Sequence, residues 1–341
     1  MQMQKILIAA TIITCLMSCG NKNNVPDTSQ ISVHVSINRF DKAFFSIDTN
    51  NIAKGLLQLN QQFPYFLSDF TVNILGTGLS SDSNNAVLAV THQFLTSYMQ
   101  VKDSIEAQFE NMDWLENQLI GSFKLLKYYF PAYQLPPKVV TYIGPFDAPG
   151  VAITRYTLAI GLQLYAGADF TFYTSVQGQE LYPRYISRRF EKPYICVNCI
   201  KALEEDLYPD SSSGKSLIEQ MIQKGKYWWL ADRLLPVTPD SLKTGYTQKQ
   251  LAWCRGNEGL IWNYILQNND IYTVDPDLIK NYIGDAPNTD GMPETSPGNI
   301  GQWVGWQIVR KYVENNSSIS PAELMKTQAK KIFEESKYKP R

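Results

Sequence analysis

Histidine is nearly absent from this sequence, and so is any imbalance of charge. The 341 residues include only two histidines, His34 and His92, and 31 lysines and arginines stand against 32 aspartates and glutamates. Two histidines cannot build a histidine-rich metal site or a multi-histidine relay, which excludes most familiar hydrolase chemistry. A formal charge of −1 lacks the basic excess that nucleic-acid binding requires. We expect no nucleic-acid partner, no cofactor and no small-molecule substrate.

Long apolar runs are also missing, except at the N-terminus. Lys5 precedes an apolar stretch over residues 6–17, which predicts a secretory signal peptide. The stretch is shorter than the roughly 20 residues that a membrane-spanning helix needs. It ends in Leu16-Met17-Ser18-Cys19, which resembles a bacterial lipobox and predicts that Cys19 is diacylated and becomes the new N-terminus. The alternative is a secretory signal that is cleaved without lipidation.

The anchor sets the predicted domain organisation and location. Hydrophobic residues make up 44% of the chain, which is ample for one large core. Gly20, rather than an acidic residue, follows Cys19, and by resemblance to known lipoprotein sorting signals this favours the outer membrane over the inner one. No acidic cluster follows Cys19, which favours the periplasmic face over the cell surface. We predict a signal peptide over residues 1–18, a flexible tether over residues 19–30 and a single α+β domain over residues 31–341. The domain is divided into an N-terminal helical part, residues 31–135, and a part that holds the sheet and the C-terminal helices, residues 136–341.

The predicted sheet is small and either antiparallel or mixed. Residues 31–37 alternate apolar and polar side chains with period two, which predicts a half-buried strand with His34 on its polar face. The other strand-like runs lie together, at residues 138–143, 151–155 and 158–164. Helical patterns cover residues 50–62 and 86–130, with Ser83 as an N-cap. The fold class is therefore mostly helical α+β.

The C-terminal half carries three helix-start signals. Capping boxes are expected at Ser216 with Glu219, at Thr247 with Gln250, and at Ser320 with Glu323. Residues 300–312 are apolar nearly all round, which predicts a central, buried helix. Gly301 and Gly305 in that helix would let a neighbouring element approach closely.

Three cysteines lie outside the signal region, and two of them form a C-x-x-C pair. Cys196 and Cys199 could be a redox dithiol, part of a zinc site, or structural residues that are buried or bridged. Zinc needs further soft ligands, which the chain hardly offers beyond Cys254. No thioredoxin-like strand precedes the pair, so the structural interpretation is favoured over a redox function.

Glu258 stands out as a carboxylate on an apolar helix face. In the helix predicted to begin at Thr247 and to run through Ile265, Glu258 falls among Leu251, Cys254 and Ile261. A buried carboxylate needs a partner, so we expect Glu258 to be a polar anchor. An unusual hydrolase would instead use it as an acid or base together with Asp147 or Asp169.

Two segments are candidate contact surfaces for a partner protein. Residues 284–299 form a loop rich in Pro, Gly and Asp that is longer than the 12 to 15 residues of ordinary loops. The other segment is rich in aromatic and arginine side chains, which interfaces favour. Its candidate contact residues are Tyr182, Arg184, Tyr185 and Arg189.

Several short motifs, taken in order, resemble one family. They run from about residue 16 to the C-terminus: Arg39-Phe-Asp41, Tyr182-Pro-Arg-Tyr-Ile186 with Arg189-Phe190, Gly225-Lys226, Gly245-Tyr246-Thr247, Asn257-Glu258, Pro297-Gly298 and Lys337-Tyr-Lys-Pro340. Together they resemble the gliding-motility lipoprotein GldB of the Bacteroidetes. The resemblance implies a lipid-anchored envelope protein that supports gliding and the type IX secretion and motility apparatus, with no catalytic activity.

The same family is distantly similar to zincin-like metallopeptidase domains. The HExxH stretch of such domains would correspond to residues 182–190, which contain no histidine and no glutamate. The resemblance therefore implies a pseudoenzyme, a zincin-like scaffold without the metal site. The hypotheses left as alternatives are a degenerate metallopeptidase-like hydrolase and a C-x-x-C redox protein.

Overall fold

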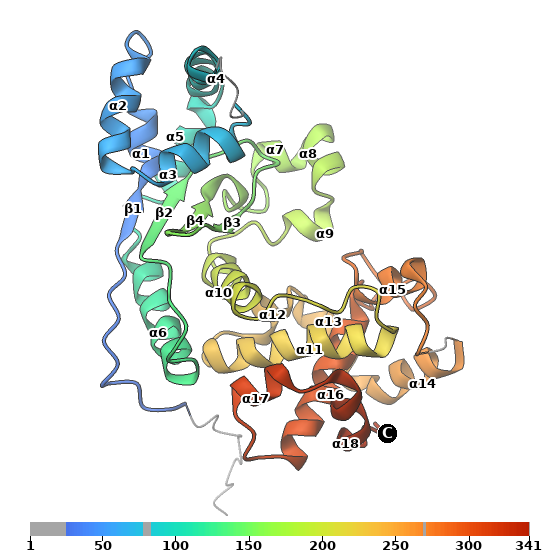
Figure 1. Cartoon of the computed structure of the whole chain (residues 1–341). Helices are drawn as coiled ribbons and strands as arrows, with labels where there is room; N and C mark the ends of the chain where they lie inside the picture. Colours follow the sequence, from blue (N-terminus) through green and yellow to red (C-terminus); the bar gives the residue numbers. More distant parts are fainter. Residues whose placement is uncertain (1–24, 78–82, 269–270, 341) are drawn as a thin grey trace, which may run out of the picture.

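A computed structural model describes residues 25–77, 83–268 and 271–340 (Figure 1). Helices dominate this part of the chain, and they pack around and beside one four-stranded sheet. The α+β class predicted from the sequence is confirmed. Within the described ranges, we find no helix with the length and apolar character needed to cross a membrane. Cys19, the predicted lipidation site, lies outside the described residues.

The sheet is mixed, which is one of the two arrangements predicted from the sequence, antiparallel or mixed. Its strands lie in the order β1 (Ile37–Arg39), β2 (Lys138–Tyr142), β4 (Thr157–Gly161) and β3 (Val151–Ile153). Strands β1 and β4 run parallel to β2, and β3 is antiparallel to β4. Every residue of β4 is buried, which explains its continuous apolar sequence.

The strand predicted at residues 31–37 is wrong in position. Only Ile37–Arg39 forms a strand, and it joins the other strands in one sheet. Its partner β2 begins at Lys138, and Ile37 lies opposite Val139, so residues 31–35 extend past the end of the neighbouring strand. An alternating sequence cannot become a strand without such a partner.

Helices on the N-terminal side cover the sheet with aromatic side chains. Phe40, Phe44 and Phe94 pack edge to face against Phe70, with ring centroids 4.9 to 6.3 Å from that of Phe70. These residues belong to a hydrophobic cluster that also contains the two central strands. The elements are α1 (Phe40–Phe45), α2 (Ile52–Gln62), α3 (Phe66–Asp69), the π-helix η1 (Phe70–Ile74), α4 (Ser83–Ser97), α5 (Met99–Gln108) and α6 (Asp113–Tyr129).

Short helices lead from the sheet to the C-terminal half. They are the 3-10 helix η2 (Leu162–Leu164), α7 (Thr171–Thr174), α8 (Val176–Leu181), α9 (Arg184–Ser187) and α10 (Tyr194–Leu207). Helix α10 packs against β3 and β4 with one side. Its other side contacts the C-terminal helices, so α10 lies between the sheet and the rest of the molecule.

The C-terminal half is entirely helical within the described residues. All three predicted capping boxes are confirmed, at the starts of α11, α13 and α17. The elements are α11 (Leu217–Leu234), α12 (Asp240–Thr244), α13 (Gln248–Gly256), α14 (Glu258–Asn268), α15 (Pro276–Ile283), α16 (Ile300–Asn315), α17 (Pro321–Lys326) and α18 (Ala329–Ser336).

The predicted continuous helix from Thr247 through Ile265 is wrong, because it is two helices. The backbone leaves the helical region at Asn257, with φ −126° and ψ 20°. The side chain of Asn257 donates a hydrogen bond to the carbonyl of Trp253 at 2.8 Å, which satisfies the end of α13 locally. Glu258 consequently begins α14 instead of lying within one apolar face.

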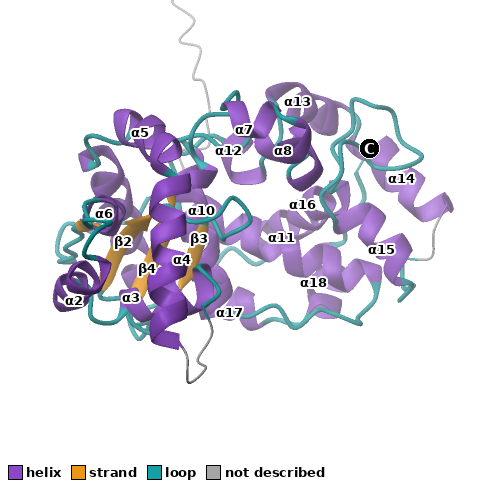
Figure 2. Cartoon of the chain, turned by 90° about the horizontal axis from the view of Figure 1, so that it is seen from above, coloured by secondary structure: helices purple, strands orange, loops and turns teal. Residues whose placement is uncertain are grey.

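A second hydrophobic cluster is built around α11 and α16. The predicted burial of α16 is confirmed, since Trp303 and Trp306 on this helix are almost completely buried. Helix α11 contributes to both clusters: Tyr227 and Leu230 belong to the cluster around the sheet, whereas Trp228 belongs to the second one. Figure 2 shows the sheet at one end of the molecule and α11 with α16 extending toward the other.

Candidate functional site

Three segments that are distant in the sequence enclose a cleft. They are α9 with the residues that follow it, the corner between α12 and α13, and the loop over residues 284–299. The cleft has a volume of about 460 Å³, and its walls include Tyr185, Tyr246, Trp253 and Pro297. We call it the outer cleft. Its combination of aromatic and polar walls is typical of a surface that binds another molecule.

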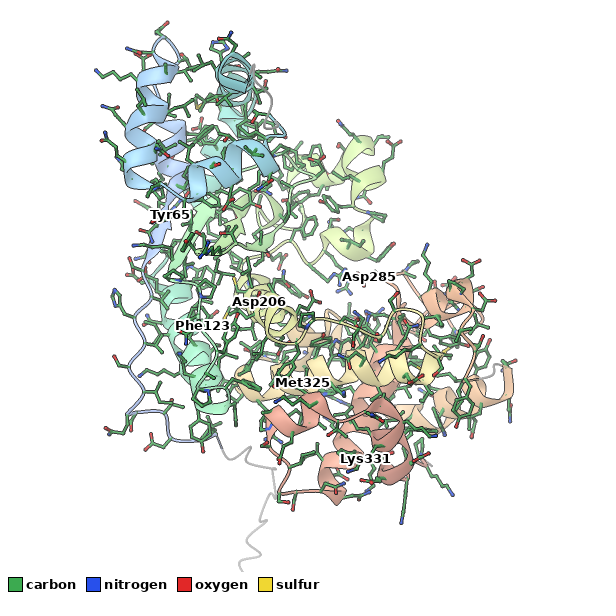
Figure 3. The ribbon with its side chains drawn as sticks, in the orientation of Figure 1. Tyr65, Phe123, Asp206, Asp285, Met325 and Lys331 are labelled. Atoms are coloured by element: carbon green, nitrogen blue, oxygen red, sulfur yellow. The ribbon has the colours of Figure 1, made fainter. Side chains whose placement is uncertain are left out.

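Two neighbouring arginines connect the walls of the outer cleft. Arg189 forms an ion pair with Asp285 of the loop at 3.2 Å, and Figure 3 places Asp285 between α9 and the C-terminal half. Arg188 donates a hydrogen bond to the carbonyl of Gly245 at 2.5 Å. Gly245 has φ +74°, and a Cβ there would lie 3.0 Å from Cδ of Arg189. Glycine therefore meets both a backbone and a steric requirement at this corner.

The 284–299 loop is ordered by its own hydrogen bonds. The hydroxyl of Thr289, which is completely buried, donates to the carbonyl of Pro297 at 2.7 Å, and its backbone N–H donates to Oγ of Ser296. A Cβ on Gly298 would lie 2.1 Å from the carbonyl oxygen of Ala286, so the backbones at the two ends of the loop are in direct contact. This loop forms a fixed wall of the cleft.

A smaller polar cavity of about 200 Å³ adjoins the outer cleft. We call it the inner chamber. The two cavities share Arg189, Thr244, Asp285 and Asn299 as lining residues. Helices α10 and α11 provide further lining residues of the chamber. These are Lys201, Glu204 and Glu205 of α10, and Lys224 and Trp228 of α11.

The inner chamber contains an unpaired buried carboxylate. Glu204 is 0% exposed, and among the described residues neither of its carboxylate oxygens has a hydrogen-bond partner. Burial raises the pKa of Glu204 well above its usual range, although the neighbouring charge of Lys201 opposes the shift. Burial also lowers the pKa of Lys201 to about 8. Both groups are therefore held in an environment that disfavours their charged forms.

A comparison with known protein families matched nearly the whole chain. Residues 21–340 match the family described as gliding motility protein GldB. The chain belongs to the GldB family. Comparisons with curated proteins and with solved structures gave no match. The family consists of motility-associated lipoproteins of the cell envelope and is not a known enzyme family.

In this GldB family member, two of the four predicted contact residues lie in the outer cleft. Tyr185 and Arg189 line it, together with part of the 284–299 loop. The other two contact neighbouring segments instead. The hydroxyl of Tyr182 donates to the carbonyl of Phe146 at 2.9 Å, and Arg184 forms an ion pair with Asp169 at 2.7 Å.

The C-x-x-C pair lies inside α10, away from both cavities of the site. Cys196, Cys199 and Cys254 are free, buried thiols in the structure. Burial raises the pKa of Cys196 to about 11 and that of Cys254 to about 12, and it raises the pKa of Cys199 well above its usual range. A reactive cysteine requires the opposite, a lowered pKa with access to solvent.

Glu258 is half-buried at the start of α14. Its Oε1 accepts a hydrogen bond from the hydroxyl of Tyr338 at 2.8 Å, which joins the C-terminal segment to this helix. Asp169 instead pairs with Arg184, and Asp147 is exposed near α8.

The two histidines lie on the surface. His34 precedes β1 and His92 is on α4, and both side chains are exposed. Across the described ranges, no group of three or more His, Cys, Asp or Glu side chains is placed so that it could hold a metal ion. The segment of residues 182–190, considered above for a zincin-like motif, forms α9 and its flanks.

Lys201 and Glu204 are site residues that the sequence patterns above did not single out. The signal was present, because Glu204 follows Leu203 and lies one turn after Ile200 on the buried side of α10. A carboxylate on an apolar helix face was the same pattern that drew attention to Glu258. Asp285 was included only as a member of the loop.

Proposed function

We propose that this GldB family member is a non-catalytic, lipid-anchored protein on the periplasmic side of the outer membrane. In this proposal it supports gliding motility and the associated type IX secretion apparatus by binding a segment of another envelope protein. The outer cleft is the binding surface, the anchor is a diacylated Cys19, and the body from residue 31 to 341 is a single domain.

One observation carries the proposal. Three segments inside the range that matches the family, around Arg189, Gly245 and Pro297, meet at one cleft although they are far apart in the sequence. The buried interior does not require this convergence, because the cleft is open to solvent and lies outside the main helix crossing of α11 with α16. Its aromatic walls and arginines are the residue types that protein interfaces favour.

The test uses the ion pair between Arg189 and Asp285. In cells, Arg189→Glu should abolish colony spreading, and Arg189→Glu combined with Asp285→Arg should restore part of it because the pair can form again with reversed charges. A photo-crosslinking residue at Tyr185 should give an adduct that is lost in the single variant and returns in the double one. The same crosslinker at Leu57, which is 68% exposed on α2, is the control.

Protein levels and membrane fractionation must be unchanged for the result to count. Spreading that is normal in Arg189→Glu, with normal protein levels, would contradict the proposal. The anchor is tested separately, since Cys19→Ala should prevent incorporation of labelled palmitate and release the protein from the outer-membrane fraction.

A further inference from the structure

The unpaired carboxylate of Glu204 indicates what the inner chamber binds. A buried acceptor without a hydrogen bond destabilises the fold, and it does so more strongly when it is charged. Glu204 lies on α10, is 0% exposed and lines the inner chamber with both oxygens unpartnered among the described residues. A ligand group that enters the chamber and donates hydrogen bonds would remove this penalty.

The charges around the chamber favour a cation. Arg189 is already paired with Asp285, and Lys224 is paired with Asp210 at 2.9 Å. The lining charges left without an ion pair among the described residues are the carboxylates of Glu204 and Glu205 and the ammonium of Lys201. A cation beside Glu204 would favour the ionised form that burial alone disfavours, and the two carboxylates would then outnumber the single ammonium.

The kind of cation follows from the donors and from the route into the chamber. The carboxylates are not arranged to hold a metal ion, since no group of three such ligands exists among the described residues. A cation held by hydrogen bonds remains, and Glu204 offers it two acceptor oxygens. Thr244 and Asn299 border both cavities, so an apolar stem that lies in the outer cleft at this border can direct its charged end toward the chamber.

We propose that the inner chamber binds the ammonium group of a lysine side chain carried by the segment that occupies the outer cleft. The ammonium donates to the carboxylate of Glu204, while the stem passes the shared wall near Thr244. This inference rests on the proposed function for the identity of the segment. The recognition of a lysine by the chamber can nevertheless be measured without the partner.

Two tryptophans report separately on the two cavities. Trp228 lines the inner chamber and Trp253 lines the outer cleft. The full chain, labelled with 5-fluorotryptophan, would be titrated with Nα-acetyl-lysine N-methylamide and followed by fluorine NMR. Single Trp→Phe substitutions assign the two signals. The norleucine analogue of the probe tests the stem without its charge, and the glutamate analogue tests an anion.

The lysine probe should shift the Trp228 signal in a saturable manner, and the norleucine probe should bind at least about tenfold more weakly, a difference of about 1.4 kcal/mol. Glu204→Gln should weaken binding of the lysine probe by a similar factor. Lys201→Met should tighten it, because a competing positive charge is removed. The opposite signs of the two variants keep the test decisive even if one of them folds poorly.

Three results would overturn the inference. Equal binding of the lysine and norleucine probes would mean that the charge is not recognised. Preference for the glutamate probe, with weaker binding in Lys201→Met, would make the chamber an anion site. An unmoved Trp228 signal would mean that the chamber holds only water. None of these affects the spreading test at Arg189, so the two proposals fail separately.

Discussion

Gly225 on α11 lies directly against Gly305 on α16. A Cβ on Gly225 would be 2.2 Å from the carbonyl carbon of Gly305, and a Cβ on Gly305 would be 1.7 Å from the carbonyl oxygen of Met221. The opposing atoms belong to backbones, which cannot rotate away as a side chain can. The two helices can cross at this distance only because both positions lack a side chain.

Gly225→Ala should therefore lower the free energy of unfolding by about 3 kcal/mol or more, which is the upper part of the range for overpacked cores. Urea unfolding would measure the change. Gly121→Ala is the matched control, because Gly121 is an exposed glycine within α6 whose added Cβ would meet nothing within 4 Å. That substitution should stabilise the protein by about 0.4–1 kcal/mol. Equal effects of the two substitutions would contradict the proposed steric origin.

Lys226 makes stability depend on pH in an unusual direction. It is 3% exposed, its Nζ donates to the carbonyls of Met325 and Thr327, and burial lowers its pKa to about 8. The unfolded chain holds this proton up to a pKa of about 10.4, so the unfolded state binds more protons between these values and stability rises with pH there. The penalty for the buried charge is fully present below about pH 8.

The comparison with Lys226→Met isolates this effect. The stability of the wild type relative to the variant should increase on the order of 3 kcal/mol between the two pKa values, because one pKa unit corresponds to about 1.4 kcal/mol. Urea unfolding at about pH 7 and about pH 9.5 would show most of the change. Cysteines and tyrosines titrate in both proteins and cancel. A difference that does not vary with pH would mean that Lys226 keeps its proton in the folded state.

Thr289 holds the wall of the outer cleft. Thr289→Val keeps the shape of the side chain but removes the donor to the carbonyls of Pro297 and Gly298. Opening of the loop should become about tenfold more frequent, which corresponds to the loss of one buried hydrogen bond of about 1.4 kcal/mol. Hydrogen exchange at the amide of Met292, which donates to the carbonyl of Thr289, would report it. Thr289→Ser should exchange as the wild type does.

The buried thiols should be inert in the folded protein. Cys196, Cys199 and Cys254 are buried and their pKa values are raised, so iodoacetamide should label them only at the rate of global unfolding. Peptide mapping by mass spectrometry after a timed exposure would locate the label. Rapid labelling of Cys196 in native buffer would bring back the redox hypothesis.

Local signals in the sequence predicted most of the fold. The capping boxes at Ser216, Thr247 and Ser320 involve residues only three apart in the sequence. The burial of α16 follows from the apolar residues of that helix alone. The strand at residues 31–37 failed because strand formation depends on a partner that lies about one hundred residues away. Local pattern also missed the break at Asn257, where a side chain competes for the backbone.

The candidate site was only half predictable for the same reason. Tyr185 and Arg189 were selected because their residue types favour interfaces. Asp285, the partner of Arg189, is 96 residues away in the sequence, and no property of either segment alone indicates the ion pair. The inner chamber requires α10, α11 and the loop to be positioned first, so its unpaired Glu204 becomes evident only in three dimensions.

Helix α11 has a consequence for how a ligand reaches this site. Its consecutive residues Tyr227 and Trp228 point about 100° apart around the helix, and they pack in different hydrophobic clusters. A hinge motion that spread the two halves apart would pull one of these rings out of its packing. The site is therefore preorganised, and in the proposed complex the bound segment would bear most of the ordering entropy.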